Sequence, residues 1–196
     1  IHTAEQVRAL DRHAIDALRI PGFTLMTRAG EAALRALCEL WPHATRVVVL
    51  CGPGNNGGDG YVLARLAREQ GLHADAVSLV PPESLQGDAA RAFQDFASSG
   101  GSIVPWDTKL LTADVIVDAM FGTGLSRALD PTSASIVEAI NASAKPILAL
   151  DIPSGLHADS GAILGAAVRA HCTMMFIGLK LGFYLGRGPD CVGELR

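Results

Sequence analysis

Short apolar runs alternate with amphipathic segments along most of the chain. Four β-branched runs predict strands at residues 47–51, 74–80, 115–118 and 147–151, and weaker runs predict strands at 102–104 and 173–177. Helical spacing of apolar residues fills the intervals at about 59–70, 85–98 and 131–142. Alternating strands and helices with nearly unbroken apolar strands indicate a parallel sheet covered on both faces. We therefore predict an α/β fold, a three-layer α/β/α Rossmann-like domain with a mainly parallel central sheet.

Two helices are predicted before the first strand. Thr3 and Gln6 have the spacing of a capping box. The apolar face of the first helix is predicted to consist of Val7, Leu10, Ala14, Ile15 and Leu18. Pro21-Gly22 should end this helix, and a second, Ala- and Leu-rich helix should run from about Thr24 to Trp41.

Composition narrows the class of protein. The chain has 196 residues, 49% of them hydrophobic and 18% charged, which is typical of one globular domain spanning residues 1–196. The net charge of −4, without a basic block, argues against nucleic acid as a partner. The apolar runs fall short of the ~18–20 residues that span a bilayer. The four cysteines form no C-x-x-C pair, so we expect free thiols and a cytoplasmic location.

The first strand leads into a glycine-rich loop, Gly52–Gly60, with a helical pattern directly behind it. Such a junction points backbone N–H groups and a helix N-terminus at a phosphate-containing ligand. The G-x-G-x-x-G spacing within the loop is weak evidence for NAD binding by itself. The next strand ends at Val80 without the acidic residue that binds a ribose, which disfavours an ordinary dehydrogenase. No Gly-Lys-Ser/Thr follows the glycines, so a P-loop is excluded.

Two more polar loops follow predicted strands, at Asp118–Leu125 and Asp151–Gly155. Ligands of an open parallel sheet bind at the carboxyl ends of its strands, so the three loops should converge on one site. Each acidic residue has a simpler alternative role: Asp59 could cap a helix, and Asp118 and Asp151 could cap turns. Asn56, Asp118 and Ser154 would together offer oxygen ligands with a single carboxylate, a set that suits a monovalent cation better than a divalent one.

The three loops, NNGGDG and DIPSG above all, resemble those of the YjeF N-terminal domain family, the NAD(P)H-hydrate epimerases. The resemblance extends over essentially the whole chain, including Met26–Gly30 and the segment Phe176–Gly182 with Lys180. It implies epimerisation between the R and S forms of NADHX and NADPHX, the hydrates of NADH and NADPH. The residues that it assigns to substrate binding are Asn55, Asn56, Gly57, Gly58, Asp59, Gly122, Thr123, Gly124, Leu125, Ser126, Arg127, Ala128 and Asp151.

The same resemblance implies one potassium ion per subunit, bound through Asn56, Asp118 and Ser154. It also implies a homodimer through the two N-terminal helices, and a dehydratase that acts on the S hydrate, either fused to this domain or separate. Asp151 is our candidate acid/base, because a carboxylate at the mouth of an apolar strand can donate and accept a proton near neutral pH.

Two interpretations stay open at this stage. Lys180 is either paired with a phosphate or site carboxylate, or a solvated surface residue. The whole domain is either an epimerase or a non-catalytic module of the same fold that binds a nucleotide-like ligand or another protein.

Overall fold

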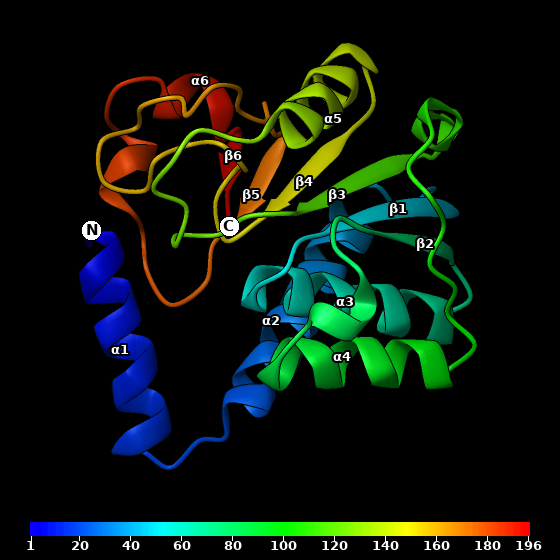
Figure 1. The fold of residues 1–196 in the computed structure, drawn as a ribbon, viewed down its shortest axis with the longest axis horizontal. Coiled ribbons are helices and arrows are strands. Elements are labelled where there is room, and N and C mark those ends of the chain that lie inside the picture. The colour runs from blue at the N-terminus through cyan, green and yellow to red at the C-terminus, as the bar shows by residue number, and fades with distance from the viewer.

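The computed structural model describes residues 1–196 and has one six-stranded sheet at its centre (Figure 1). The strands are β1 Arg46–Cys51, β2 His73–Ser78, β3 Val115–Ala119, β4 Ile147–Leu150, β5 Cys172–Met174 and β6 Glu194–Leu195. Their order is β2-β1-β3-β4-β5-β6, and every neighbouring pair is parallel. The predicted parallel sheet is confirmed.

Helices cover both faces of the sheet (Figure 1). They are α1 Ala4–Asp16, α2 Gly22–Leu40, α3 Asn55–Glu69, α4 Gly87–Ser98, α5 Pro131–Ala142 and the short α6 Gly188–Cys191. The second to fourth helices lie together on one face, with α5 on the other. This arrangement confirms the three-layer prediction. No helix is both long and apolar enough to cross a membrane.

The alternation of side chains along β1 divides the core into two parts. Val47, Val49 and Cys51 are buried in the larger cluster, together with residues of α2, α3 and α4. Val48 and Leu50 point to the opposite face and pack against α5. A strand buried on both faces has no room for polar residues, which explains the unbroken apolar run in the sequence.

The position of the ligand site follows from the strand order. The chain runs from β1 outward to β2, then returns to place β3 on the other side of β1. The loops that leave β1 and β3 therefore diverge, and a crevice opens between them at the carboxyl edge of the sheet.

Several predicted boundaries need correction. The third helix begins at Asn55, four residues before the predicted start, because the two asparagines and two glycines form its first turn. Residues 102–104 contribute a single bridge between Ile103 and Ala76 instead of a strand. Leu10 on α1 and Leu18, which lies beyond the end of the helix at Asp16, are exposed, so the predicted apolar face is only partly buried.

The N-cap of α5, Asp130, allows a first test of the fold. Asp130 accepts hydrogen bonds from the backbone N–H groups of Thr132 and Ser133 and from the Ser133 hydroxyl, at 3.0, 3.1 and 2.6 Å. Asp130→Ala leaves these donors without their partner and should lower the free energy of unfolding by about 1 kcal/mol in urea titrations. Asp130→Asn keeps an acceptor oxygen and should retain most of the stability; an equal loss in both variants would contradict the capping role.

Candidate active site

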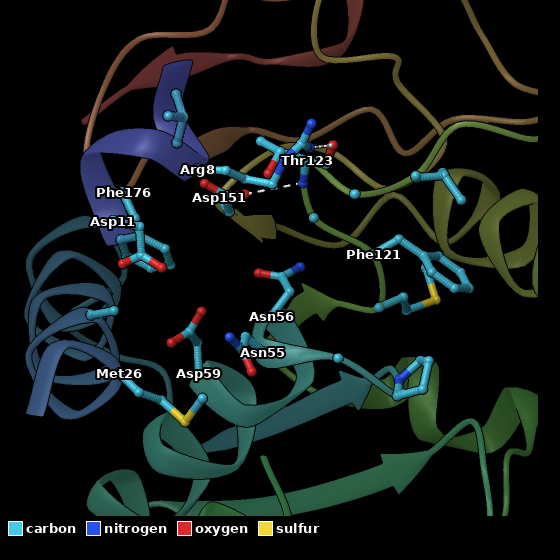
Figure 2. A pocket seen from close by; sticks show the side chains of 18 of the residues that line it. Arg8, Asp11, Met26, Asn55, Asn56, Asp59, Phe121, Thr123, Asp151 and Phe176 are labelled. Atoms are coloured by element: carbon cyan, nitrogen blue, oxygen red, sulfur yellow. Dashed lines mark hydrogen bonds between the residues drawn. The ribbon is translucent and has the colours of Figure 1, made fainter. Parts of the chain in front are cut away.

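A cavity of about 900 Å³ lies at the carboxyl edge of the sheet. Its walls come from α1 and α2 on one side and from the three polar loops on the other (Figure 2). The predicted convergence of the loops is therefore found, and the volume is in the range of small-molecule sites.

Glycines bring the first two loops into direct backbone contact. A Cβ atom on Gly52 would lie 1.6 Å from the carbonyl oxygen of Met120, and one on Gly57 would lie 2.0 Å from the carbonyl oxygen of Gly52. Only hydrogen atoms fit at these positions. The glycines therefore fix the N-terminal turn of α3 against the loops that follow β1 and β3.

All three loops meet around Gly122. A Cβ atom there would lie 3.1 Å from Asp151 Oδ2 and 3.4 Å from Asn56 Cβ. The next residue, Thr123, donates its backbone N–H to Asp151 Oδ2 at 3.2 Å (Figure 2). This close approach places the second loop beside both the helix N-terminus and the carboxylate of the third loop.

Asp151 sits in a strained backbone position. Its φ of 64° is in the left-handed region, which a residue with a Cβ rarely adopts. The residue follows the end of β4 and turns its carboxylate to the cavity that it lines. Its Oδ1 accepts a hydrogen bond from Lys180 Nζ at 2.5 Å. A costly conformation that aims a carboxylate into a cavity is typical of functional residues.

Asp118 and Ser154 form a polar pair at the ends of β3 and β4. Both are fully buried. The Ser154 hydroxyl donates to Asp118 Oδ1 at 2.6 Å, and the Ser154 N–H donates to Oδ2 at 2.8 Å. Burial raises the pKa of Asp118 to about 6, although the hydrogen bonds from Ser154 and Met120 act in the opposite direction. An unpaired negative charge here would be costly, so the pair is suited to a positive partner.

Asn56 lies in the first turn of α3, and only 8% of its surface is exposed. Neither its amide nitrogen nor its amide oxygen has a hydrogen-bond partner in the protein, although both atoms are buried. Buried polar atoms are nearly always satisfied, so an orphaned amide at the edge of a cavity indicates a ligand or ion that completes it.

Three of the carboxylates that line the cavity come from separate elements: Asp11 from α1, Asp59 from α3 and Asp151 from the third loop (Figure 2). Burial raises the pKa of Asp59 well above its usual value, and the charges of Asp151 and Asp11 raise it further. Burial and Asp151 also raise the pKa of Asp11, against the effect of Arg12. Burial and both neighbouring charges thus act on Asp59 in the same direction, against its ionised form.

Comparison with known proteins identifies the family. The model of the YjeF-related protein N-terminus family matches residues 22–182. The chain belongs to this family. The crystal structure of the yeast protein ynu0 shares the fold, with a TM-score of 0.85 at 21% identity over 95% of this chain and 84% of the yeast chain.

Two curated relatives of this YjeF-type domain differ in length. The NAD(P)H-hydrate epimerase of Limosilactobacillus fermentum is 34% identical over 98% of this chain and 93% of its own length. The bifunctional NAD(P)H-hydrate repair enzyme Nnr of Coxiella burnetii is 43% identical over the whole chain. The chain spans only 40% of the length of that bifunctional protein.

Within the YjeF-type domain, most of the predicted ligand-binding residues line the cavity. These are Asn55, Asn56, Asp59, Gly122, Thr123, Gly124, Leu125, Ser126, Arg127, Ala128 and Asp151. Gly57 and Gly58 lie behind the wall, where Gly58 packs against Met26 and Ala89. Asp118 and Ser154 are buried and are not part of the lining.

Two alternative roles considered from the sequence are wrong. Asp59 does not cap α3, because the helix begins at Asn55 and its N-cap is Gly54. Lys180 is not a solvated surface residue, because its side chain is completely buried. Both residues belong to the site or its immediate surroundings.

The contribution of α1 to the site was not predicted from the sequence. Arg8 and Asp11 line the cavity, and Arg8 Nη1 donates to the Thr123 carbonyl at 3.4 Å (Figure 2). One signal was available: Val7, Asp11 and Ile15 are spaced by four residues and share the face that lines the cavity. An acidic residue within an otherwise apolar helical face indicates a site at that position.

Proposed function

We propose that this domain is an NAD(P)H-hydrate epimerase that interconverts the R and S forms of NADHX and NADPHX. The observation that carries the proposal is Asp151, a carboxylate aimed into a nucleotide-sized cavity and held there by Thr123 and Lys180. The name of the Limosilactobacillus fermentum relative, which matches over nearly its full length, supports the same activity.

Different residues around the cavity bind different parts of the dinucleotide substrate. The N-terminal turn of α3, at Asn55–Asp59, presents free N–H groups and a partial positive charge to the phosphates of the dinucleotide. The loop Gly122–Ala128 forms the opposing wall and carries Arg127. Arg8 supplies a second cation from α1. In this arrangement the hydrated nicotinamide ring reaches Asp151.

The reaction inverts a ring carbon that carries a hydroxyl group and is bonded to the ring nitrogen. In one route, Asp151 takes the hydroxyl proton, the C–O bond becomes C=O, and the ring C–N bond breaks with its electrons passing to nitrogen, which takes the proton. Ring closure on the other carbonyl face then gives the second epimer.

In the other route, the carboxyl group of Asp151 protonates the hydroxyl, which leaves as water while the nitrogen lone pair forms C=N. Water then adds to the opposite face and gives its proton to Asp151, and the C=N electron pair returns to nitrogen. Both routes need one group that donates and accepts a proton, and both include a step in which an O–H proton passes to the Asp151 carboxylate.

The residues also fit one potassium ion per subunit, held by Asn56, Asp118 and Ser154. The orphaned amide of Asn56 and the buried carboxylate of Asp118 form a hard-oxygen donor set with one negative charge. When bound, the ion would supply positive charge and hold the three loops in fixed relative positions. It would also offset the cost of the buried carboxylate.

A thermal-shift series tests this ion. Potassium chloride should raise the midpoint of unfolding relative to equal tetramethylammonium chloride, because an ion that binds only the folded state stabilises it. Asp118→Asn removes the charge of the donor set and should abolish the potassium-specific shift, whereas Asp114→Asn is a matched control directly before the start of the same strand. A shift of equal size in the Asp118 variant would rule out this site.

The activity itself is tested by epimer exchange. One purified NADPHX epimer is incubated with the protein in potassium buffer, and appearance of the other is followed by chromatography against the spontaneous rate. Rapid equilibration supports the epimerase. Correctly folded protein that gives no acceleration in potassium or sodium would contradict it and would favour a non-catalytic binding module.

We further propose the setting in which the domain acts. The longer Coxiella burnetii relative is named a bifunctional repair enzyme, which supports a dehydratase partner, fused or separate, that consumes the S hydrate. The exposed Leu10 on α1 and the exposed Leu18 just after that helix support a homodimer through the N-terminal helices. Four free cysteines fit a cytoplasmic location.

A further inference from the structure

Lys180 stands out among the charged residues because its side chain is completely buried. A buried ammonium group is costly unless it is paired, and lysine is almost never found in this state without a partner. Lys180 Nζ donates to Asp151 Oδ1 at 2.5 Å and to the Phe176 carbonyl at 2.9 Å. The Phe183 ring lies below it, with its centroid 5.6 Å from Nζ. These contacts compensate the buried positive charge of the Lys180 ammonium group.

The lysine lies behind the carboxylate, away from the cavity. Asp151 lines the cavity and keeps 15% of its side chain exposed, whereas Lys180 does not line it. The two oxygens of the carboxylate are held from different directions, since Oδ1 takes the ammonium and Oδ2 takes the Thr123 N–H. Lys180 therefore reaches a ligand only through its two partners, the Asp151 carboxylate and the backbone of Phe176, both of which line the cavity.

The backbone around the lysine is fixed for this contact. His2 forms two backbone hydrogen bonds to the residues that flank it, from His2 N–H to the Leu179 carbonyl and from the Leu181 N–H to the His2 carbonyl, at 2.7 and 2.9 Å. Asp151 itself has a left-handed φ of 64°, whereas Lys180 has an extended backbone with a φ of −87°. A strained carboxylate residue held by a buried ion pair points to a functional position, since an apolar pair would stabilise a core equally well.

We propose that Lys180 is a positioning residue for the reaction, which uses its positive charge and its hydrogen bond to hold the Asp151 carboxylate in the orientation that exchanges a proton with the substrate hydroxyl. This role rests on the proposed epimerase function. It predicts that the lysine affects the rate of turnover more than the binding of substrate, because it does not touch the cavity.

A double-mutant cycle tests this role, with Lys180→Met, Asp151→Asn and the double variant in the epimer-exchange assay. Rates are expressed per folded protein, with the folded fraction taken from near-ultraviolet circular dichroism at the assay temperature. Lys180→Met should lower kcat by about 30- to 100-fold with KM within about threefold. In the Asp151→Asn background the same substitution should have no further effect on kcat.

A second variant separates charge from hydrogen bonding. Lys180→Gln keeps N–H donors and removes the charge, so it should lose nearly as much kcat as Lys180→Met. Two results would overturn the positioning role if the wild-type enzyme exchanges epimers. One is an equal loss of kcat from Lys180→Met in both backgrounds. The other is a wild-type kcat in folded Lys180→Met and Lys180→Gln. A wild type that gives no exchange would overturn the epimerase function and this role with it.

Discussion

Asp151→Asn is expected to reduce epimer exchange by about a thousandfold, the usual scale for loss of a general acid/base. Asparagine keeps the shape of the side chain and an oxygen that can accept from Thr123, but it can neither take nor return a proton. The loss should therefore appear in kcat, with substrate binding largely retained. The measurement is the initial rate of conversion of one NADPHX epimer at saturating substrate.

A control must separate the loss of catalysis in Asp151→Asn from the loss of stability caused by leaving Lys180 unpaired. Removal of one partner of a buried ion pair leaves the other charge uncompensated and costs up to about 3–5 kcal/mol. Asp151→Asn with Lys180→Met removes both charges, so it should recover stability but not activity. Full exchange in the folded Asp151→Asn protein would refute the catalytic assignment.

The sequence was sufficient to predict the central strands of the sheet because they are buried on both faces. β1, β3 and β4 each contain an uninterrupted apolar run, at Val47–Cys51, Val115–Val117 and Ile147–Leu150, and a polar segment that lines the site or packs beneath it follows each run. The sequence also predicted the chemistry of the site. Apolar strands that are followed directly by glycines, an amide and carboxylates are typical of a ligand site at the sheet edge. Asp151 and the three loops were placed correctly at one edge.

Features of the site that depend on tertiary contacts could not be predicted from the sequence. The cavity wall formed by α1 depends on how that helix docks, and the spacing of its apolar residues suggested a face that includes the exposed Leu10. The burial of Lys180 depends on an ion pair to a residue 29 positions earlier, with His2 holding the flanking backbone. The start of α3 was misplaced because Asn and Gly have low helix propensity, which the contacts around Gly57 override.

A large structural effect is expected from a single methyl group on Gly57. Gly57→Ala places a Cβ atom 2.0 Å from the backbone carbonyl oxygen of Gly52, and neither backbone has a flexible end that could move away. The first turn of α3 must shift from the loop after β1, and we expect a loss of about 2–4 kcal/mol in the free energy of unfolding. Because Asn56 and Asp59 lie on the same turn, exchange activity should fall together with stability.

Gly54→Ala is the matched control, since it adds the same methyl group to the same loop. A Cβ atom there meets nothing within 4 Å, and the φ of −102° is open to alanine. This variant should lose less than about 1 kcal/mol, the scale of a helix-cap change. Urea unfolding of both proteins, followed by circular dichroism, compares the two losses directly. If they are equal, the close contact between Gly57 and the Gly52 carbonyl does not fix the loop, and the glycines act through chain flexibility alone.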